Sequence, residues 1–157
     1  MKLSKMVFVA SLLTLTTSTL AQTTADLNNI PPPIQMGEIK KNSEFPQFLQ
    51  GEVTLLGEQF PGAEEAITKQ LKAKRIKLQV ITSKGAAPRF QALKKLGADV
   101  RYLNTPSMEG AAIYVGKDLI IMLTQDEPRK WVYIKDLATV TRSKEALKAA
   151  WTYSQPL

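Results

Sequence analysis

In the middle of the chain, segments whose apolar residues have the spacing of β-strands alternate with segments whose apolar residues have the spacing of α-helices. Three short runs have the apolar or alternating pattern of β-strands: residues 53–56, 76–81 and 100–103. The first of them is expected at a sheet edge. Two intervening segments place apolar side chains on one face at helical spacing: residues 62–75 and 88–96. This order of strand, helix, strand, helix and strand predicts parallel neighbouring strands with helices packed on the sheet.

The pattern changes after Pro106. Residues 111–115 and 119–123 are apolar strands separated by Gly116-Lys117-Asp118, a spacing typical of an antiparallel hairpin. Residues 131–134 predict another strand, and Ser143 is expected to cap a final helix. The whole pattern predicts an α/β fold, a mixed β-sheet sandwiched by helices on both faces.

The first residues have the three parts of a signal peptide. Lys2 and Lys5 precede an uncharged apolar run over residues 6–15, and small residues lead to Ala21. Cleavage is expected between Ala21 and Gln22, which predicts an exported protein, periplasmic or secreted. A retained membrane anchor is the alternative, but the apolar run is short for a membrane span and rich in Thr.

Proline marks the next segment. The Pro31-Pro32-Pro33 run is poor material for a helix or a central strand, so residues 22–50 are expected to be a Pro-containing linker. The domain organisation predicted from the sequence is therefore a signal peptide over residues 1–21, this linker, and one α/β domain over residues 51–157.

The composition excludes several kinds of chemistry. The chain has no Cys and no His, which rules out disulfides, thiolate nucleophiles, Ser-His-Asp triads and most zinc sites. No cofactor or metal is expected. The net charge of +7 becomes +5 when Lys2 and Lys5 are removed. This excess favours anionic partners such as nucleic acid, anionic lipid or acidic glycan, although an ordinary soluble surface explains it more simply.

Several local phrases resemble the phospholipase D-like phosphodiesterase and nuclease superfamily. They occur in the family's order: Phe60–Ala63 leading to Ala73-Lys74-Arg75-Ile76, then 92–101, 112–121 and 132–136 with the helix ending at Trp151. The resemblance covers roughly residues 51–155. It implies the fold of that family and, because its members with one repeat commonly pair, a homodimer.

The catalytic motif of that family is degenerate in this chain. The family uses His-x-Lys-x4-Asp followed by a Gly-Ser-x-Asn-like turn, in which His attacks phosphorus and Lys holds phosphoryl oxygens. The corresponding positions here are Glu109, Ala111 and Gly116, and the turn becomes 123–126, where Thr124 is the one conservative match and Asp126 replaces Asn. Phosphoryl transfer depends on positive charge around the developing anion. The sequence therefore predicts a catalytically inactive domain.

Three functional hypotheses follow from this departure. The first is an exported, noncatalytic binding or self-associating module. The second is a phosphodiesterase or nuclease with a rebuilt active site, which the absence of His disfavours. The third is a noncatalytic binder of nucleic acid or another polyanion. No stable membrane anchor is expected in any of them.

Five cations in turns or at helix starts are candidate anion-binding residues: Lys84, Arg89, Lys117, Arg129 and Lys130. Lys84 and Arg89 flank the turn after the strand that ends at Thr82. Since ligands favour the carboxyl ends of parallel strands, this turn is the preferred location. Solvated surface charges are the simpler interpretation of all five.

Two further pairs of residues have alternative interpretations. Glu109 and Asp126 could ligate a divalent metal or act as an acid–base couple, but surface carboxylates are the simpler interpretation. Trp131 and Trp151 could stack on bases or sugars. Both lie in apolar patterns, which favours packing in the core or in a dimer interface.

Overall fold

A computed structural model describes residues 33–157 of the chain. The predicted signal peptide (1–21) and residues 22–32 of the predicted linker lie outside the described residues. Residues 34–157 form one folded unit. No helix among the described residues has the length and hydropathy needed to cross a membrane.

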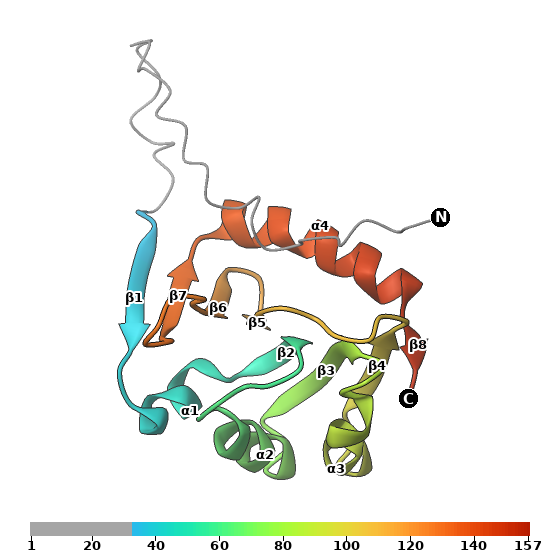
Figure 1. The fold of residues 1–157 in the computed structure, drawn as a ribbon. Coiled ribbons are helices and arrows are strands. Elements are labelled where there is room, and N and C mark those ends of the chain that lie inside the picture. Colours follow the sequence, from blue (N-terminus) through green and yellow to red (C-terminus); the bar gives the residue numbers. More distant parts are fainter. Residues whose placement is uncertain (1–32) are drawn as a thin grey trace, which may run out of the picture. The chain divides into compact units, whose positions relative to one another are not determined.

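An eight-stranded mixed sheet organises this unit (Figure 1). Its strands are β1 Gln35–Ile39, β2 Gly51–Gly57, β3 Ile76–Ser83, β4 Asp99–Leu103, β5 Ala111–Val115, β6 Leu119–Leu123, β7 Trp131–Lys135 and β8 Gln155–Pro156. The spatial order is β1-β7-β6-β5-β2-β3-β4-β8. Only β2, β3 and β4 are parallel neighbours, and every other pairing is antiparallel. The predicted mixed sheet is confirmed.

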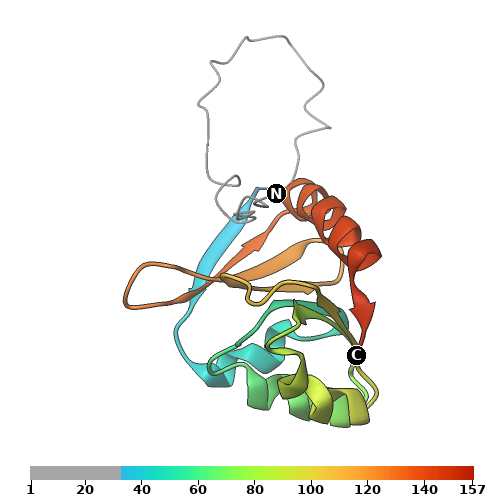
Figure 2. The same cartoon turned by 45° about the vertical axis from the view of Figure 1, so that its right-hand side comes forward.

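Helices cover both faces of the sheet, as predicted (Figure 2). They are α1 Phe45–Phe48, α2 Glu64–Lys72, α3 Gln91–Lys95 and α4 Leu137–Tyr153, with 3-10 turns at Asn42–Glu44 and Ala87–Phe90. The first three pack on one face around the larger apolar core. The last crosses the other face alone over a smaller core that contains Ile81, Val140 and Leu147.

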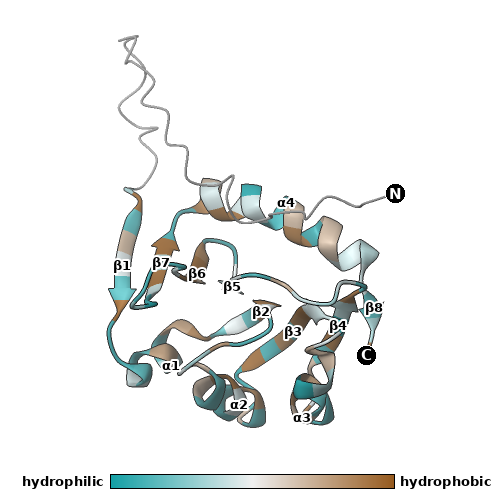
Figure 3. Ribbon diagram, viewed as in Figure 1, coloured by the Kyte–Doolittle hydropathy of each residue, from teal (hydrophilic) through white to brown (hydrophobic). Residues whose placement is uncertain are grey.

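Buried and exposed side chains alternate along the first half of β3, so the strand presents different residues to the two faces of the sheet. Ile76, Leu78 and Val80 are buried in the larger core, whereas Lys77 and Gln79 are exposed on the opposite face. Side chains alternate between the faces of a strand, so these two polar residues lie on the α4 side. Figure 3 shows β3 and β7 largely in the colours of hydrophobic residues.

The predicted linker is wrong over its described part. Residues 34–50 contain β1, which pairs antiparallel with β7, and α1. Ile39, Phe45 and Leu49 are all buried in the larger core. Pro46 lies in the first turn of α1, where a missing N–H costs nothing. The proline run and the irregular spacing of the apolar residues concealed these elements, and the fold begins at Ile34 rather than Gly51.

Two local predictions also need correction. β2 is a central strand between β5 and β3, not an edge strand. The final helix begins at Leu137, where the Asp136 side chain accepts a hydrogen bond from the Thr139 amide at 2.8 Å. Ser143 lies inside the helix and donates to the Thr139 carbonyl. Weak helix formers in the first turns concealed the true start.

Candidate functional site

The two ends of the parallel strands carry different functional groups. We call the end at which β2, β3 and β4 finish the carboxyl end of the sheet, and the end at which they begin the amino end. Because β5 is antiparallel to β2, it starts at the carboxyl end, where β6 also finishes. The degenerate motif positions Glu109, Ala111, Thr124 and Asp126 therefore share the carboxyl end. Gly116 lies in the hairpin turn at the amino end, where its amide donates to the Glu52 carbonyl at 2.9 Å.

The segment before β5 lies against the end of β2. The Met108 amide donates a hydrogen bond to Glu58 Oε1 at 2.6 Å. A Cβ at Gly57, whose φ is +141°, would approach the Gly110 carbonyl oxygen to 2.8 Å, so glycine is required for this close approach. Sequence reasoning missed Glu58, whose only signal is its position directly after a strand that ends at the ligand-favoured end of the sheet.

The motif positions have little catalytic capacity in this arrangement. Ala111 is 8 % exposed at the start of β5, and no cation replaces the lysine of the related motif. Glu109 is exposed, and within residues 33–157 no ion pair includes it. Glu58, Glu109 and Asp126 are three carboxylates at this end that form no ion pair within residues 33–157. An incoming phosphate would meet negative charge.

Thr124 has a structural role. Its amide donates to the Lys130 carbonyl at 2.8 Å, and its hydroxyl accepts from the Lys130 amide at 2.8 Å. These two bonds close the loop between β6 and β7. Asp126 lies in the exposed part of that loop. In the part of the chain that the structure describes, no cluster of three or more His, Cys, Asp or Glu side chains could hold a metal ion.

The predicted anion-binding cations are not brought together. Lys84 and Arg89 lie near one another in sequence on the exposed segment after β3, and the Lys84 amide donates to the Leu103 and Thr105 carbonyls. Arg129 pairs with Glu127 at 3.2 Å, and Lys130 pairs with Glu38 at 3.5 Å. Lys117 lies in the β5–β6 turn at the amino end of the sheet, beside Gly116.

The two tryptophans have different environments. Trp131 is 6 % exposed, stands edge-on to Phe45 at 5.6 Å, and donates its Nε1–H to the Pro61 carbonyl at 2.8 Å. The core position predicted for it is confirmed. Trp151 is half-buried at the end of α4 and packs against the smaller core. The guanidinium of Arg101 lies 4.5 Å from the centre of its ring.

Comparison with known proteins identifies the fold. Nuc, a phospholipase D family member from Salmonella typhimurium, superposes with a TM-score of 0.59 at 11% identity, over 80% of this chain and 97% of Nuc. NucT from Helicobacter pylori gives 0.58 at 11% identity, over 80% of this chain and 99% of NucT. The fold is therefore that of the phospholipase D-like superfamily, as the sequence resemblance implied.

A DNA-binding protein shares the same architecture. TrmBL2, an archaeal chromatin protein described with a novel mode of DNA binding, superposes with a TM-score of 0.57 at 16% identity. The match covers 87% of this chain and 57% of TrmBL2, so this chain spans little more than half of that protein's length. No family model matches the sequence, and no curated protein matches it.

Proposed function

We propose that this protein is an exported, noncatalytic binding module with a phospholipase D-like fold, and that its ligand is a polyanion. The observation that carries the proposal is the pair Glu109 and Ala111 at the start of β5. The first places a carboxylate, and the second a buried methyl group, where the related enzymes have a nucleophilic His and a phosphate-binding Lys.

Electrostatics support the absence of catalysis. A phosphodiester is itself an anion, and the transition state of its hydrolysis gathers more negative charge on the phosphoryl oxygens. Glu58, Glu109 and Asp126 oppose that charge at the carboxyl end of the sheet. Two of the four cations at this end, Arg129 and Lys130, already pair with carboxylates.

Charge and fold support a polyanion as the ligand. The chain carries 21 Lys and Arg against 14 Asp and Glu. TrmBL2, which has the same fold, binds DNA. A protein surface rich in Lys and Arg binds phosphate polymers electrostatically and without catalysis, and the affinity falls steeply with salt.

The direct test is a phosphodiesterase assay. The purified protein is expected to release no product from a generic phosphodiester above a buffer control, because no side chain at the motif positions can both attack and stabilise the phosphoryl group. A robust rate that is lost in Glu109→Gln would establish a rebuilt active site and refute the noncatalytic proposal.

Self-association is the second part of the proposal. Among residues 33–157, β1 is an edge strand whose one partner is β7, and Ile34 and Met36 in and beside it are 59 % and 68 % exposed. Apolar side chains on an open strand edge favour pairing with a second chain. A homodimer is the state expected from light scattering, and a monomer at all concentrations would exclude it.

A further inference from the structure

A groove crosses the α4 face of the sheet at its amino end. It has a volume of about 920 Å³ and lies between the first halves of β2 and β3 and the second half of α4. Its principal walls are Thr54, Lys77, Gln79, Lys144, Lys148 and Trp151. The sequence analysis did not identify this place, because its residues come from strands and a helix far apart in the chain.

Lysines give the groove its charge. Lys77 and Lys148 are exposed and face it from the sheet and from α4, and Lys74 lies at its entrance. The ammonium of Lys144 donates to the Gly116 carbonyl. Within residues 33–157 none of these four lysines forms an ion pair. The exposed Lys74, Lys77 and Lys148 therefore keep their ammonium groups available for an anionic ligand, while Lys144 is held by Gly116.

Carboxylates in the groove reduce this positive charge without cancelling it. Glu52, Asp99 and Glu145 also line the groove. Asp99 Oδ1 lies 3.9 Å from Arg101 Nε, so this acid already faces a cation of its own. Five further cations lie at the same amino end of the sheet without lining the groove: Lys72, Arg75, Lys94, Lys95 and Lys117.

Lys74 has an unusual backbone for a lysine. Its φ is +56°, the left-handed conformation that commonly follows a helix and that glycine adopts most easily. The corresponding residue after α3 is Gly97, with φ +101°. Such a conformation is strained for a residue that carries a side chain. Lys74 lines the groove just after the end of α2.

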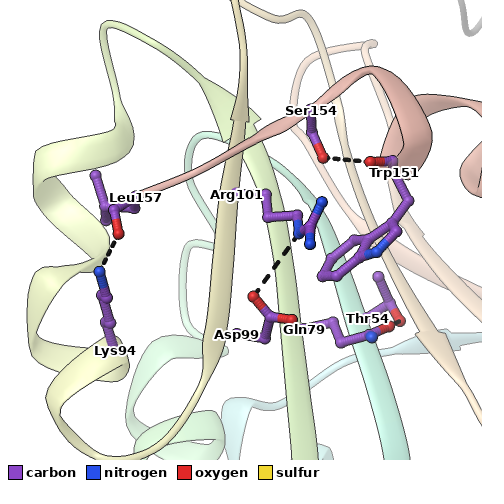
Figure 4. A network of polar contacts seen from close by, with 8 residues as sticks. All are labelled: Thr54, Gln79, Lys94, Asp99, Arg101, Trp151, Ser154 and Leu157. Carbon is purple, nitrogen blue, oxygen red and sulfur yellow. Dashed lines mark hydrogen bonds and ion pairs between the residues drawn. The ribbon is translucent and has the colours of Figure 1, made fainter.

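An aromatic surface lies in the same groove. Trp151 lines it, with the Arg101 guanidinium 4.5 Å from the ring centre (Figure 4). Arg101 Nε is buried, has no hydrogen-bond partner within residues 33–157, and lies 3.9 Å from Asp99 Oδ1. Beside them, Thr54 Oγ1 donates to Gln79 Oε1 at 3.3 Å, which leaves the Gln79 amide nitrogen available.

We propose that this groove binds single-stranded nucleic acid, its phosphates held by Lys77, Lys148 and Lys74 and a base placed against Trp151. The inference rests on the proposed polyanion-binding function and gives it a site. A basic groove with a stacking aromatic is the usual combination for single strands. A duplex keeps its bases stacked inside the helix, where the tryptophan cannot reach them. This site lies at the opposite end of the sheet from Lys84 and Arg89.

The test measures fluorescence anisotropy of a labelled 12-nucleotide single strand with the full chain at low salt. The wild-type protein is expected to bind, with an affinity that falls as salt rises. Lys77→Glu combined with Lys148→Glu is expected to weaken binding about tenfold or more, because two phosphate contacts are reversed. The matched control, Lys40→Glu with Lys41→Glu, makes the same change in net charge on two exposed lysines after β1 and should shift affinity less than about twofold. Lys84→Glu with Arg89→Glu is measured beside them as the competing anion site.

A second readout separates the groove from general charge effects. Binding is expected to quench the fluorescence of Trp151 but not that of buried Trp131, so the quench should disappear in Trp151→Phe. Circular dichroism of each variant establishes that it is folded.

The outcomes distinguish the site from the function. If the wild-type chain binds no polyanion at low salt, the proposed function fails and the groove proposal fails with it. If the chain binds and only Lys84→Glu with Arg89→Glu weakens binding, the function stands and the groove is the wrong site. Equal affinity for a duplex or for heparin would overturn the assignment to single strands.

Discussion

Asp136 determines where α4 begins. Its carboxylate accepts a hydrogen bond from the Thr139 amide. Hydrogen bonding by the side chain and then by the amide of Thr139 holds the pKa of the Asp136 carboxyl below its usual range. A carboxyl group with a lowered pKa in the folded state stabilises the fold at pH values above its unfolded pKa, about 3.9. This stabilisation is lost as the pH falls through the lower, folded pKa.

Asp136→Ala tests this cap. We expect a lower melting temperature than that of the wild-type chain at pH 7, because the first turn of α4 loses its acceptor. The difference should shrink as the pH falls below about 4, where the wild-type carboxyl also becomes protonated. The measurement is thermal unfolding by circular dichroism at both pH values.

Asp126→Ala is the matched control for the cap. Asp126 is exposed in the β6–β7 loop. Its replacement should leave the melting temperature unchanged at both pH values. A cap effect that persists undiminished at pH 3 would show that the charge on Asp136 plays no part.

Single residues also mark how far sequence reasoning reaches at the candidate site. The sequence predicted the hairpin over residues 111–123, and the structure places Glu109 and Thr124 at its open end. The sequence could not show that the Thr124 hydroxyl accepts a hydrogen bond from the Lys130 amide, or that Glu58 accepts one from the segment before β5. Both contacts depend on the way loops from distant strands meet, which local patterns do not encode.

At the scale of elements, β1 and α1 belong to the fold although their apolar residues have no regular spacing. Phe45 is fully buried and contacts Trp131, which itself stacks with Phe60. These rings connect the segment before β2 to β7 and to the start of α2. Residues 34–50 therefore contribute to the core and are not a linker.

Phe45→Ala tests the role of this segment. We expect a loss of about 3–5 kcal/mol in the free energy of unfolding, because the change leaves a cavity among buried rings. Urea unfolding measures it. Gln47→Ala, on the exposed side of the same short helix, should change stability by less than about 0.5 kcal/mol. A similarly small loss for Phe45→Ala would mean that the segment is dispensable.

The elements with a regular period were predictable. The alternation over residues 76–81 and the hairpin over residues 111–123 were located from spacing alone, because each has one clear period and a turn. The short α1 has only four residues and no measurable period. The position of β2 in the centre of the sheet follows from its pairing with β5, a contact across more than fifty residues.

The two ends of the sheet differ in their balance of charge. The carboxyl end carries Glu58, Glu109 and Asp126, which form no ion pair within residues 33–157, beside the cations Lys84 and Arg89. The amino end carries more lysines, those that follow α2 and α3 and those of the groove, together with the carboxylates of the groove. The total charge was readable from composition, but its polarity required the topology, because helices and strands alternate in direction.

The proposed export of the protein concerns the whole chain and has a direct test. Mass spectrometry of the protein recovered from the periplasm or the medium is expected to find Gln22 at the amino end, because small residues precede it at the positions that a signal peptidase recognises. The control is the same measurement on the cytoplasmic fraction. Recovery of an intact Met1 outside the cytoplasm would contradict cleavage.

The central claim is that this phospholipase D-like fold binds a phosphate polymer and leaves it intact. The most direct measurement incubates the full chain with a labelled single strand at low salt, records the bound fraction, and then determines the length of the recovered strand by mass spectrometry. The account predicts a bound strand recovered at full length. A strand cleaved in many turnovers, with cleavage lost in Glu109→Gln, would contradict it.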